Sequence, residues 1–585
     1  MVRRSGIRNY FTALGLLVMF TCGLAFCKKE FLHIIPNEQL SEELLTDETS
    51  LEKVLIGCYS VLTGRDQLFY SGFGNWMHGS VRGAEANRGT NAGDSSPLPP
   101  VQRFEILPTS DVSAQKWRMC YEGVARCNAL LRLLNAVVDP GINENVKTNI
   151  SAQTRFLRGF YYFELRRLFN AVPYLDENMS AEEAAKVPNN VDIYPKIEED
   201  FKFAAANLPE IQAESGRANQ WAAKAFLAKV YLYQQKFSEA GTLFTGVIQN
   251  GVTSNGQPYS LVPKYADFFK AENDNSAESV FAAQTAVNTG STANANGENV
   301  LNFPYNTGSD GPAGCCGFFQ PSFDLVNSFR VDANGLPLPG GSYNDPANEV
   351  KSDFGLKSNN PFTPDAGPLD PRLDHSVGRR GIPYLDWIEH PGDEWIRDQQ
   401  YAGPYSPKKF VFYKATMNTF TDGTSWTRGW TAINQPLMRF ADVLLMAAEC
   451  EIEAGSLEKA REYVNRVRTR AANPDSWVKR ADGSNAANYV IGLYDQPWTD
   501  KAVARDAVRF ERKLELSGEG HRFFDLVRWG VAATVLNAYL QFEGARLIIA
   551  LGGASFTPNK DEYYPIPQRE IDILGAEILK QNPGY

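Results

Sequence analysis

The chain has 585 residues, more than one domain usually contains and enough to bury a large core. Its 58 basic and 68 acidic side chains give a formal net charge of −10 at pH 7. Affinity for nucleic acid comes largely from neutralising phosphates with lysine and arginine, so this acidic balance argues against a nucleic-acid partner. Attraction of the folded chain to an anionic membrane surface is disfavoured for the same reason.

The N-terminus has the pattern of an export signal. Residues 1–8 include three arginines, residues 10–26 are mostly apolar, and Cys27 follows directly. The apolar run is shorter than the roughly 20 residues of a membrane-spanning helix, and its basic start is typical of a secretory signal. The pattern resembles a bacterial lipoprotein signal with a degenerate lipobox, which implies cleavage after residue 26 and acylation of Cys27. An ordinary signal peptide and an uncleaved anchor remain alternatives.

The cysteines and histidines do not form a recognisable metal or disulfide pattern. There is no CxxC and no HExxH, and the five histidines are scattered. Cys315 and Cys316 are adjacent, and we expect two free thiols rather than a vicinal disulfide. Residues 386–398 are rich in carboxylates but lack the ordered alternation and central glycine of a calcium-binding loop. We therefore expect no metal ion and no other cofactor.

Helical periodicity dominates both ends of the chain. The first part contains a Gly-, Asn- and Ser-rich stretch over 72–100, and helices are predicted at 38–63, 112–138, 148–169, 190–208 and 217–249. Later helices are predicted at 436–454, 457–471, 500–517 and 522–541. Gly455 and Ser456 provide a helix stop and an N-cap, so the first two of these later helices form a hairpin.

The middle of the chain has a different character. Residues 250–434 are rich in Gly, Pro, Asn and aromatic residues, with strand-like runs at Ser279–Gln284 and Lys409–Tyr413. A structureless loop of this length inside a helical domain would be unusual. We therefore expect an insertion with its own irregular structure, and loops of this kind often carry function.

Two segments repeat a pattern of small and apolar residues with the same spacing. Ala228 and Ala240 are twelve residues apart, as are Ala448 and Ala460. Small residues at these positions let two helices approach closely, and larger residues at 244, 247, 464 and 467 fill the groove between them. This is the tetratricopeptide pattern, although Lys224 and Glu451 stand where aromatic residues are usual.

A series of short blocks in a fixed order resembles the SusD/RagB family of Bacteroidetes outer-membrane lipoproteins. The blocks are FLHIIP from Phe31, IGCYSVL from Ile56, RFLRGFYYFELRRLFNAVPYL from Arg155, SAESVFAAQ from Ser276, DPRLD from Asp370, MRFADVLLMAAE from Met438, ERKLELSGEGHRFFDLVRWG from Glu511, YYPIPQREI from Tyr563 and QNPGY from Gln581. Each block is weak alone, but the ordered set covers the chain from its signal to its last residue.

The resemblance implies a mainly α fold. Residues 27–585 would form a single domain with tetratricopeptide-like hairpins in a helical body, helical over about 37–249 and 435–585, and an irregular insertion of loops and short strands over about 250–434. It also implies a non-catalytic lipoprotein of the outer membrane, exposed at the cell surface. Such a protein captures oligosaccharide and delivers it to a SusC-like TonB-dependent transporter.

Most residues of the recognised blocks have structural explanations. We expect the stripe Phe156, Phe160, Phe163 and Leu168 to lie in the core. The block from Glu511 combines acids, arginines and a histidine, which we expect to form ion pairs between helices: Glu511, Arg512, Glu515, His521, Arg522, Asp525 and Arg528.

Candidate ligand-binding residues lie in the loop regions. Sugars offer apolar C–H faces and rings of hydroxyl groups, so their sites combine flat aromatic rings with polar hydrogen-bonding side chains. The family implies a glycan site made of the 72–100 stretch and the insertion, but its ligand residues vary. Composition and location therefore select the candidates Trp76, Arg82, Asn87, Arg88, Tyr305, Phe318, Trp387, Trp395 and Trp426.

Three alternatives remain open. A secreted glycoside hydrolase would use two carboxyl groups, chosen from Glu85, Asp94, Glu389 and Glu394. A peptide-binding lid of the RagB type would have the same fold and a different cargo. A scaffold would use its helical hairpins to bind protein alone.

Overall fold

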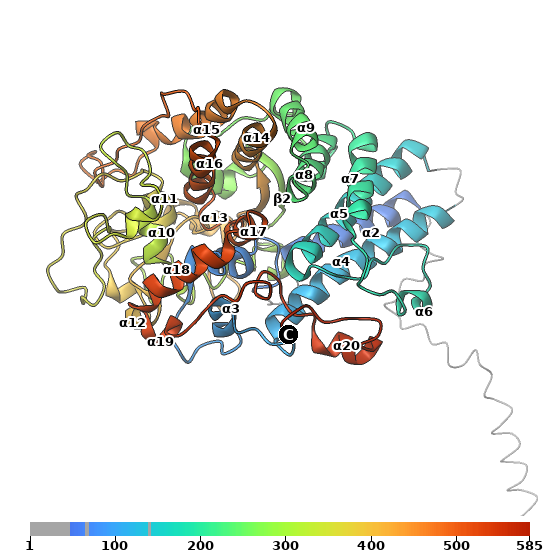
Figure 1. The fold of residues 1–585 in the computed structure, drawn as a ribbon, viewed down its shortest axis with the longest axis horizontal. Helices are drawn as coiled ribbons and strands as arrows, with labels where there is room; N and C mark the ends of the chain where they lie inside the picture. Colours follow the sequence, from blue (N-terminus) through green and yellow to red (C-terminus); the bar gives the residue numbers. More distant parts are fainter. Residues whose placement is uncertain (1–46, 65–68, 138–141) are drawn as a thin grey trace, which may run out of the picture.

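The computed structural model describes residues 47–64, 69–137 and 142–585. The predicted signal at 1–26 and the predicted lipidation site Cys27 lie outside these ranges. Figure 1 shows a helical body with the first helices on one side and the irregular insertion on the other. No helix in the described ranges combines the length and the apolar character needed to span a membrane.

The first helices pack around an aromatic core. They are α2 (Glu48–Tyr59), α4 (Asp111–Ala136), α5 (Glu144–Phe169), α6 (Ala181–Ala184) and α7 (Tyr194–Asn207), with the short η3 (Ser60–Thr63) after α2. Helix α5 packs against both α4 and α7. Its predicted core stripe is confirmed, because all four side chains are buried and Phe156 meets Phe226 edge-to-face.

Two helical hairpins continue the body, as the repeat predicts. The first is α8 (Gln220–Tyr233) with α9 (Phe237–Asn250), and the second is α14 (Phe440–Ala454) with α15 (Leu457–Ala471). Helix α14 of the second hairpin packs on α9 of the first, and this contact joins the two hairpins. The paired alanines at 228, 240, 448 and 460 are fully buried. Ser456 caps α15 by accepting a hydrogen bond from the Lys459 amide.

The insertion contains short strands and short helices. Strand β2 (Ser279–Ala283) is confirmed, and it pairs antiparallel with β6 (Gln435–Arg439). The helix predicted from residue 436 is therefore wrong over its first four residues, because these form β6. The predicted strand Lys409–Tyr413 is also wrong, and the nearby strand β5 (Ser406–Pro407) pairs with β4 (Val377–Gly378) instead.

Strand pairing attaches the 72–100 stretch to the insertion. This stretch contains the π-helix η4 (Trp76–Val81), β1 (Ala86–Gly89) and the start of α3 (Pro99–Arg103), and β1 pairs antiparallel with β3 (Phe318–Pro321). The insertion also has a small core of its own, formed by Phe303, Tyr384, Trp395, Val411 and Phe412. The short α-helices of the insertion are α10 (Phe323–Ser328), α11 (Leu373–Ser376), α12 (Gln399–Ala402) and α13 (Met417–Phe420).

The C-terminal part consists of α16 (Lys501–Glu515), α17 (Arg522–Arg528), α18 (Ala532–Gly544), α19 (Ile548–Leu551) and α20 (Gln568–Leu574). The single helix predicted over 522–541 is wrong, because the helix is interrupted between the end of α17 and the start of α18. Gly530 in this break has φ +70°, a conformation that favours glycine.

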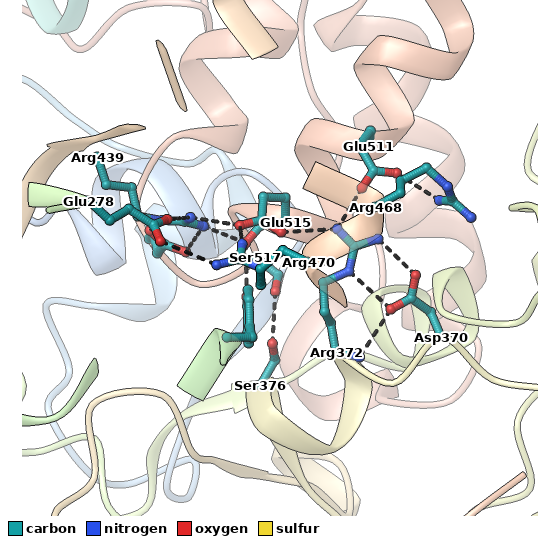
Figure 2. Close-up of polar contacts among 12 residues, drawn as sticks. Glu278, Asp370, Arg372, Ser376, Arg439, Arg468, Arg470, Glu511, Glu515 and Ser517 are labelled. Carbon is teal, nitrogen blue, oxygen red and sulfur yellow. Dashed lines mark hydrogen bonds and ion pairs between the residues drawn. The ribbon is translucent and has the colours of Figure 1, made fainter. Parts of the chain in front are cut away.

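A buried ion network connects α16 to the body and to the insertion (Figure 2). Arg372 donates to Glu511 at 2.6 Å and to Glu515 at 3.0 Å, while Arg439 donates to Glu515 at 2.6 Å. Arg470 also pairs with Glu515. The carboxyl groups thus hold together arginines from three distant parts of the chain.

The predicted ion pairs of the block from Glu511 are largely confirmed. Arg512 pairs with Asp525 at 3.0 Å, and Arg528 pairs with Glu449 at 2.6 Å. Across the ranges that the structure covers, neither His521 nor Arg522 forms an ion pair. Burial lowers the pKa of His521 to about 4, which favours its neutral form at pH 7.

The cysteine prediction is partly wrong. Cys315 and Cys316 are joined in a vicinal disulfide rather than being free thiols. The four other cysteines of the described chain, at 58, 120, 127 and 450, are free and buried.

Candidate functional site

Two candidate residues of the 72–100 stretch are buried inside the protein. Trp76 is 3% exposed, and its indole N–H donates to the Phe69 carbonyl at 2.8 Å. The Arg82 guanidinium lies between the Phe523 ring at 3.9 Å and the Tyr564 ring at 4.2 Å. Neither side chain offers a surface to a ligand in this structure.

Four further candidates are also buried. Asn87 donates to a Glu543 carboxylate oxygen at 3.1 Å, and the Arg88 Nε donates to the Tyr401 hydroxyl at 3.0 Å. Phe318 and Trp395 have 2% and 4% of their surface exposed. Together with Trp76 and Arg82, they hold the loops on the body, and their burial leaves them outside any surface site.

The burial of Glu543 makes stability depend on pH. Burial raises the pKa of Glu543 to about 7 from 4.5, so the folded protein holds this proton more tightly than the unfolded chain. Its contribution to stability is therefore complete below about pH 4.5 and is lost as the pH rises through 7.

Replacing Glu543 by glutamine is expected to remove this loss, because the amide resembles the protonated acid. Relative to the wild type, the variant should gain roughly 2–3 kcal/mol of unfolding free energy between pH 5 and pH 8, at about 1.4 kcal/mol per pKa unit. Urea unfolding at both pH values measures the difference. Glu577→Gln, at an exposed position, is the control and should follow the wild type; equal pH profiles for the two variants would contradict the assignment.

Three candidate residues remain accessible. Tyr305 and Trp387 are half-buried, and Trp426 is 54% exposed. The Trp387 indole donates to the Phe412 carbonyl at 3.3 Å, so its ring is fixed at the edge of the insertion core. Trp426 contacts Phe69 edge-to-face at 6.4 Å and leaves much of its ring open.

Tyr305 lies in a polar cluster where the insertion meets the 72–100 stretch. The Arg397 guanidinium lies over its ring at 5.1 Å and donates to the Thr90 hydroxyl at 2.7 Å. Arg397 also pairs with Asp94. The Tyr305 amide donates to the Trp395 carbonyl at 2.9 Å, which fixes the backbone of Tyr305 beside this pair. We call Tyr305, Arg397, Thr90 and Asp94 the Tyr305 site.

The backbone around the Tyr305 site is strained. Thr90 has φ +57°, a rare conformation for a β-branched residue, which costs about 1–3 kcal/mol and tends to occur at functional sites. Its amide donates to the Gly317 carbonyl, and Gly317 itself has φ +79°. A Cβ at Gly317 would lie 3.3 Å from the Tyr305 Cβ, so glycine lets the two loops approach.

The site combines one half-buried aromatic ring with an arginine, a carboxylate and a hydroxyl. This is a chemistry that suits a sugar, with its apolar faces and hydroxyl groups. Sequence reasoning did not select Arg397 or Thr90 as members of this cluster. Arg397 follows Trp395 by two residues in the carboxylate-rich segment and could have been selected there, whereas no sequence signal marks the strain at Thr90.

Three of the four carboxyl groups considered for hydrolysis are engaged in separate contacts. Glu85 is buried and accepts from the Gly518 amide at 3.1 Å, and burial raises its pKa to about 7. Asp94 pairs with Arg397, and Glu389 pairs with Arg480 at 2.6 Å. Among the described residues, no group of three or more His, Cys, Asp or Glu side chains is placed to hold a metal ion.

Comparison with known families identifies the fold. The model of the SusD family matches residues 277–585, more than half of the chain. The chain belongs to the SusD family. A second model, described as starch-binding associating with the outer membrane, matches residues 30–232. The resemblance stated from the sequence is therefore confirmed.

Known relatives of this SusD-family protein extend over nearly its whole length. SusD-like protein P25 of Formosa agariphila is 26% identical and covers 97% of this chain and 98% of its own. A SusD-like carbohydrate binding protein of Bacteroides fragilis has a TM-score of 0.68 at 22% identity, covering 90% and 98% of the two chains. Surface glycan-binding protein A of Bacteroides thetaiotaomicron, solved with laminarihexaose, has a TM-score of 0.63 at 21% identity, covering 91% and 99%. At these identities the structures establish the fold.

Proposed function

We propose that this SusD-family protein is a non-catalytic, lipid-anchored protein of the outer membrane that binds an oligosaccharide at the cell surface. The observation that carries the proposal is the Tyr305 site, where a partly accessible aromatic ring and fixed polar groups lie at the junction of two loop regions. Family membership and the glycan-binding relatives support it. Trp387 and Trp426 are the other accessible aromatic residues proposed to contact the ligand.

The bound oligosaccharide is proposed to pass to a SusC-like TonB-dependent transporter. A ligand that contacts both proteins stabilises the closed arrangement by differential binding, so the SusD-family protein acts as a lid. The lipid on Cys27 would hold it beside the transporter, since two or more acyl chains give stable anchoring. Mass spectrometry of the native protein tests this step, and an unmodified thiol with residues 1–26 still attached would exclude it.

Replacing Tyr305 by alanine is expected to weaken oligosaccharide binding at least tenfold, or about 1.4 kcal/mol, because the variant loses its aromatic stacking surface. Calorimetric titration of the soluble chain from residue 28, with a ligand chosen from a glycan array, measures the change. Tyr231→Ala is the control, because Tyr231 is a half-buried tyrosine on α8, in the helical body. Equal affinities of the two variants would remove Tyr305 from the site.

The hydrolase alternative is tested with the same ligand. Prolonged incubation should leave the oligosaccharide intact, and cleavage that disappears in Glu85→Gln or Asp94→Asn would establish an enzyme instead. The RagB-type alternative predicts that a peptide library binds while the glycan array does not. Failure of both classes of ligand, with a stable transporter complex, would favour a scaffold.

A further inference from the structure

A cavity lies on the C-terminal side of the body, between α16, α17, α18 and a loop of the insertion. Its volume is about 570 Å³, within the range of small-molecule sites. Its walls are mostly apolar and aromatic, and they include Leu336, Tyr494, Ala507, Phe510, Trp529 and Val535, with Asp332 and Asp506 as acidic members. We call it the α16–α18 cavity.

Two arginines line this cavity without an ionic partner. In the part of the chain that the structure covers, neither the Arg509 side chain nor the Arg522 side chain forms a hydrogen bond or an ion pair. Their contact is with the Trp529 ring, whose centroid lies 4.8 Å from Arg509 and 5.7 Å from Arg522. The Arg509 Nε is buried and has no acceptor. This differs from the arginines of Figure 2, which all donate to carboxylates.

Within the described ranges, the acids near this pair form no ion pair with either arginine. Asp332 and Asp506 also line the cavity, where Asp506 is exposed and the Asp332 carboxylate accepts from the Leu336 amide at 2.8 Å. Glu449 accepts from Arg528 and from the Trp529 indole at 3.0 Å. The neighbouring Lys513 is likewise neutralised by Asp324 at 2.7 Å. Burial lowers the pKa of Arg509, and the nearby Glu449 and Asp506 offset this cost of desolvating the charge only in part. An anion in the cavity would remove that cost.

We propose that the α16–α18 cavity is a second ligand site, which binds an acidic saccharide unit through the guanidinium groups of Arg509 and Arg522. Guanidinium groups match the planar geometry of carboxylates and also bind sulfate-like oxyanions, so the shared chemistry is an anionic group on a sugar ring. Trp529, Tyr494 and Phe510 supply apolar surface for the ring. The choice of a saccharide rests on the proposed function, whereas the choice of an anion rests on the two arginines.

The test uses three disaccharide probes that differ in charge: lactose, lactose 3′-sulfate and digalacturonate. Calorimetric titration of the soluble chain at low salt should show binding of at least one acidic probe, at least tenfold tighter than lactose and weakened by added salt. The sulfated and carboxylated probes distinguish the two sources of negative charge. Failure of both acidic probes to bind, or equal affinity for lactose, would overturn the proposal.

Variants then locate the binding. Arg509→Gln should weaken the acidic probe at least tenfold, and Ala507→Trp should do the same by filling the cavity without changing its charge. Arg505→Gln is the matched control, because Arg505 lies one turn earlier on α16, outside the cavity, and pairs with Glu453. Arg522→Gln adds a further measurement where circular dichroism shows native folding. Unchanged affinity in Arg509→Gln and Ala507→Trp would overturn the proposal.

The result is separable from that at the Tyr305 site. Tyr305→Ala should leave the acidic disaccharide bound in the α16–α18 cavity, whereas Arg509→Gln should leave neutral oligosaccharide binding unchanged. Loss of the acidic probe in Tyr305→Ala, with no loss in Arg509→Gln, would assign it to the first site and overturn the second. If the wild type bound no neutral oligosaccharide, the proposed function would be contradicted. The comparison of acidic-probe affinity between the wild type and Arg509→Gln would still test the α16–α18 cavity.

Discussion

Replacing Glu515 by glutamine is expected to lower the free energy of unfolding by about 3–5 kcal/mol, as when one partner of a buried ion pair is removed. Glu515 is completely buried and pairs with Arg372, Arg439 and Arg470. The glutamine would keep the shape of the side chain but would leave these arginines without full compensation of charge. The midpoint of urea unfolding, followed by circular dichroism, measures the effect.

The pH dependence of stability should change with the same substitution. Burial alone raises the pKa of Glu515, but the three arginines outweigh it and hold the pKa well below its ordinary value. A lowered pKa gives stability that is present above about pH 4.5 and is lost as the pH falls toward the folded-state pKa. The wild type should therefore lose more stability than Glu515→Gln between pH 5 and pH 3.

Glu458→Gln is the matched control for this experiment. Glu458 pairs with Arg461 at the surface of α15, where water screens the interaction. Its unfolding midpoint should coincide with that of the wild type. If Glu515→Gln behaved like Glu458→Gln, the buried network would not be the connection that holds α16 to the insertion.

The sequence predicts the helical body well because its signals are local. The spacing of Ala228 and Ala240 and the stop at Gly455 depend on neighbouring turns, and both hairpins form as expected. The ion pairs of the block from Glu511 could also be predicted, because charged side chains buried in a helical body need partners of opposite charge. In contrast, β1 and β6 were not predicted, because each is defined by a partner far away in the sequence.

The candidate site was harder to predict for a related reason. Trp395 and Trp426 have similar loop-like surroundings in sequence, yet one is 4% exposed and the other 54%. Only the folded arrangement decides which aromatic residues fill the insertion core and which remain open. Likewise, Thr90 and Arg397 meet across 307 residues of chain, a distance at which neither composition nor periodicity carries information.

Replacing Gly79 by alanine is expected to disrupt the packing that supports the Tyr305 site. Gly79 lies in η4, and an added Cβ would be 1.9 Å from the Gly520 carbonyl oxygen. Gly520 in turn has φ +78°, and a Cβ there would be 1.9 Å from the Gly74 carbonyl oxygen. The two backbones therefore touch where the 72–100 stretch meets the turn between α16 and α17.

Because backbone atoms cannot rotate away as a side chain can, the contact must open to admit a methyl group. The cost should reach or exceed the upper end of the roughly 1–3 kcal/mol that overpacking usually carries. The 72–100 stretch includes Thr90 and Asp94, so oligosaccharide affinity should fall together with stability. Urea unfolding and calorimetric titration of the same preparation measure both effects.

Gly246→Ala separates this effect from the general effect of alanine on the chain. Gly246 lies within α9, and nothing within 4 Å would meet its Cβ. Alanine has the higher helix propensity, so this variant should gain up to about 1 kcal/mol while its affinity stays unchanged. If Gly79→Ala had the stability and the oligosaccharide affinity of the wild type, η4 could move away from Gly520 without displacing Thr90. The Tyr305 site would then not depend on this backbone contact.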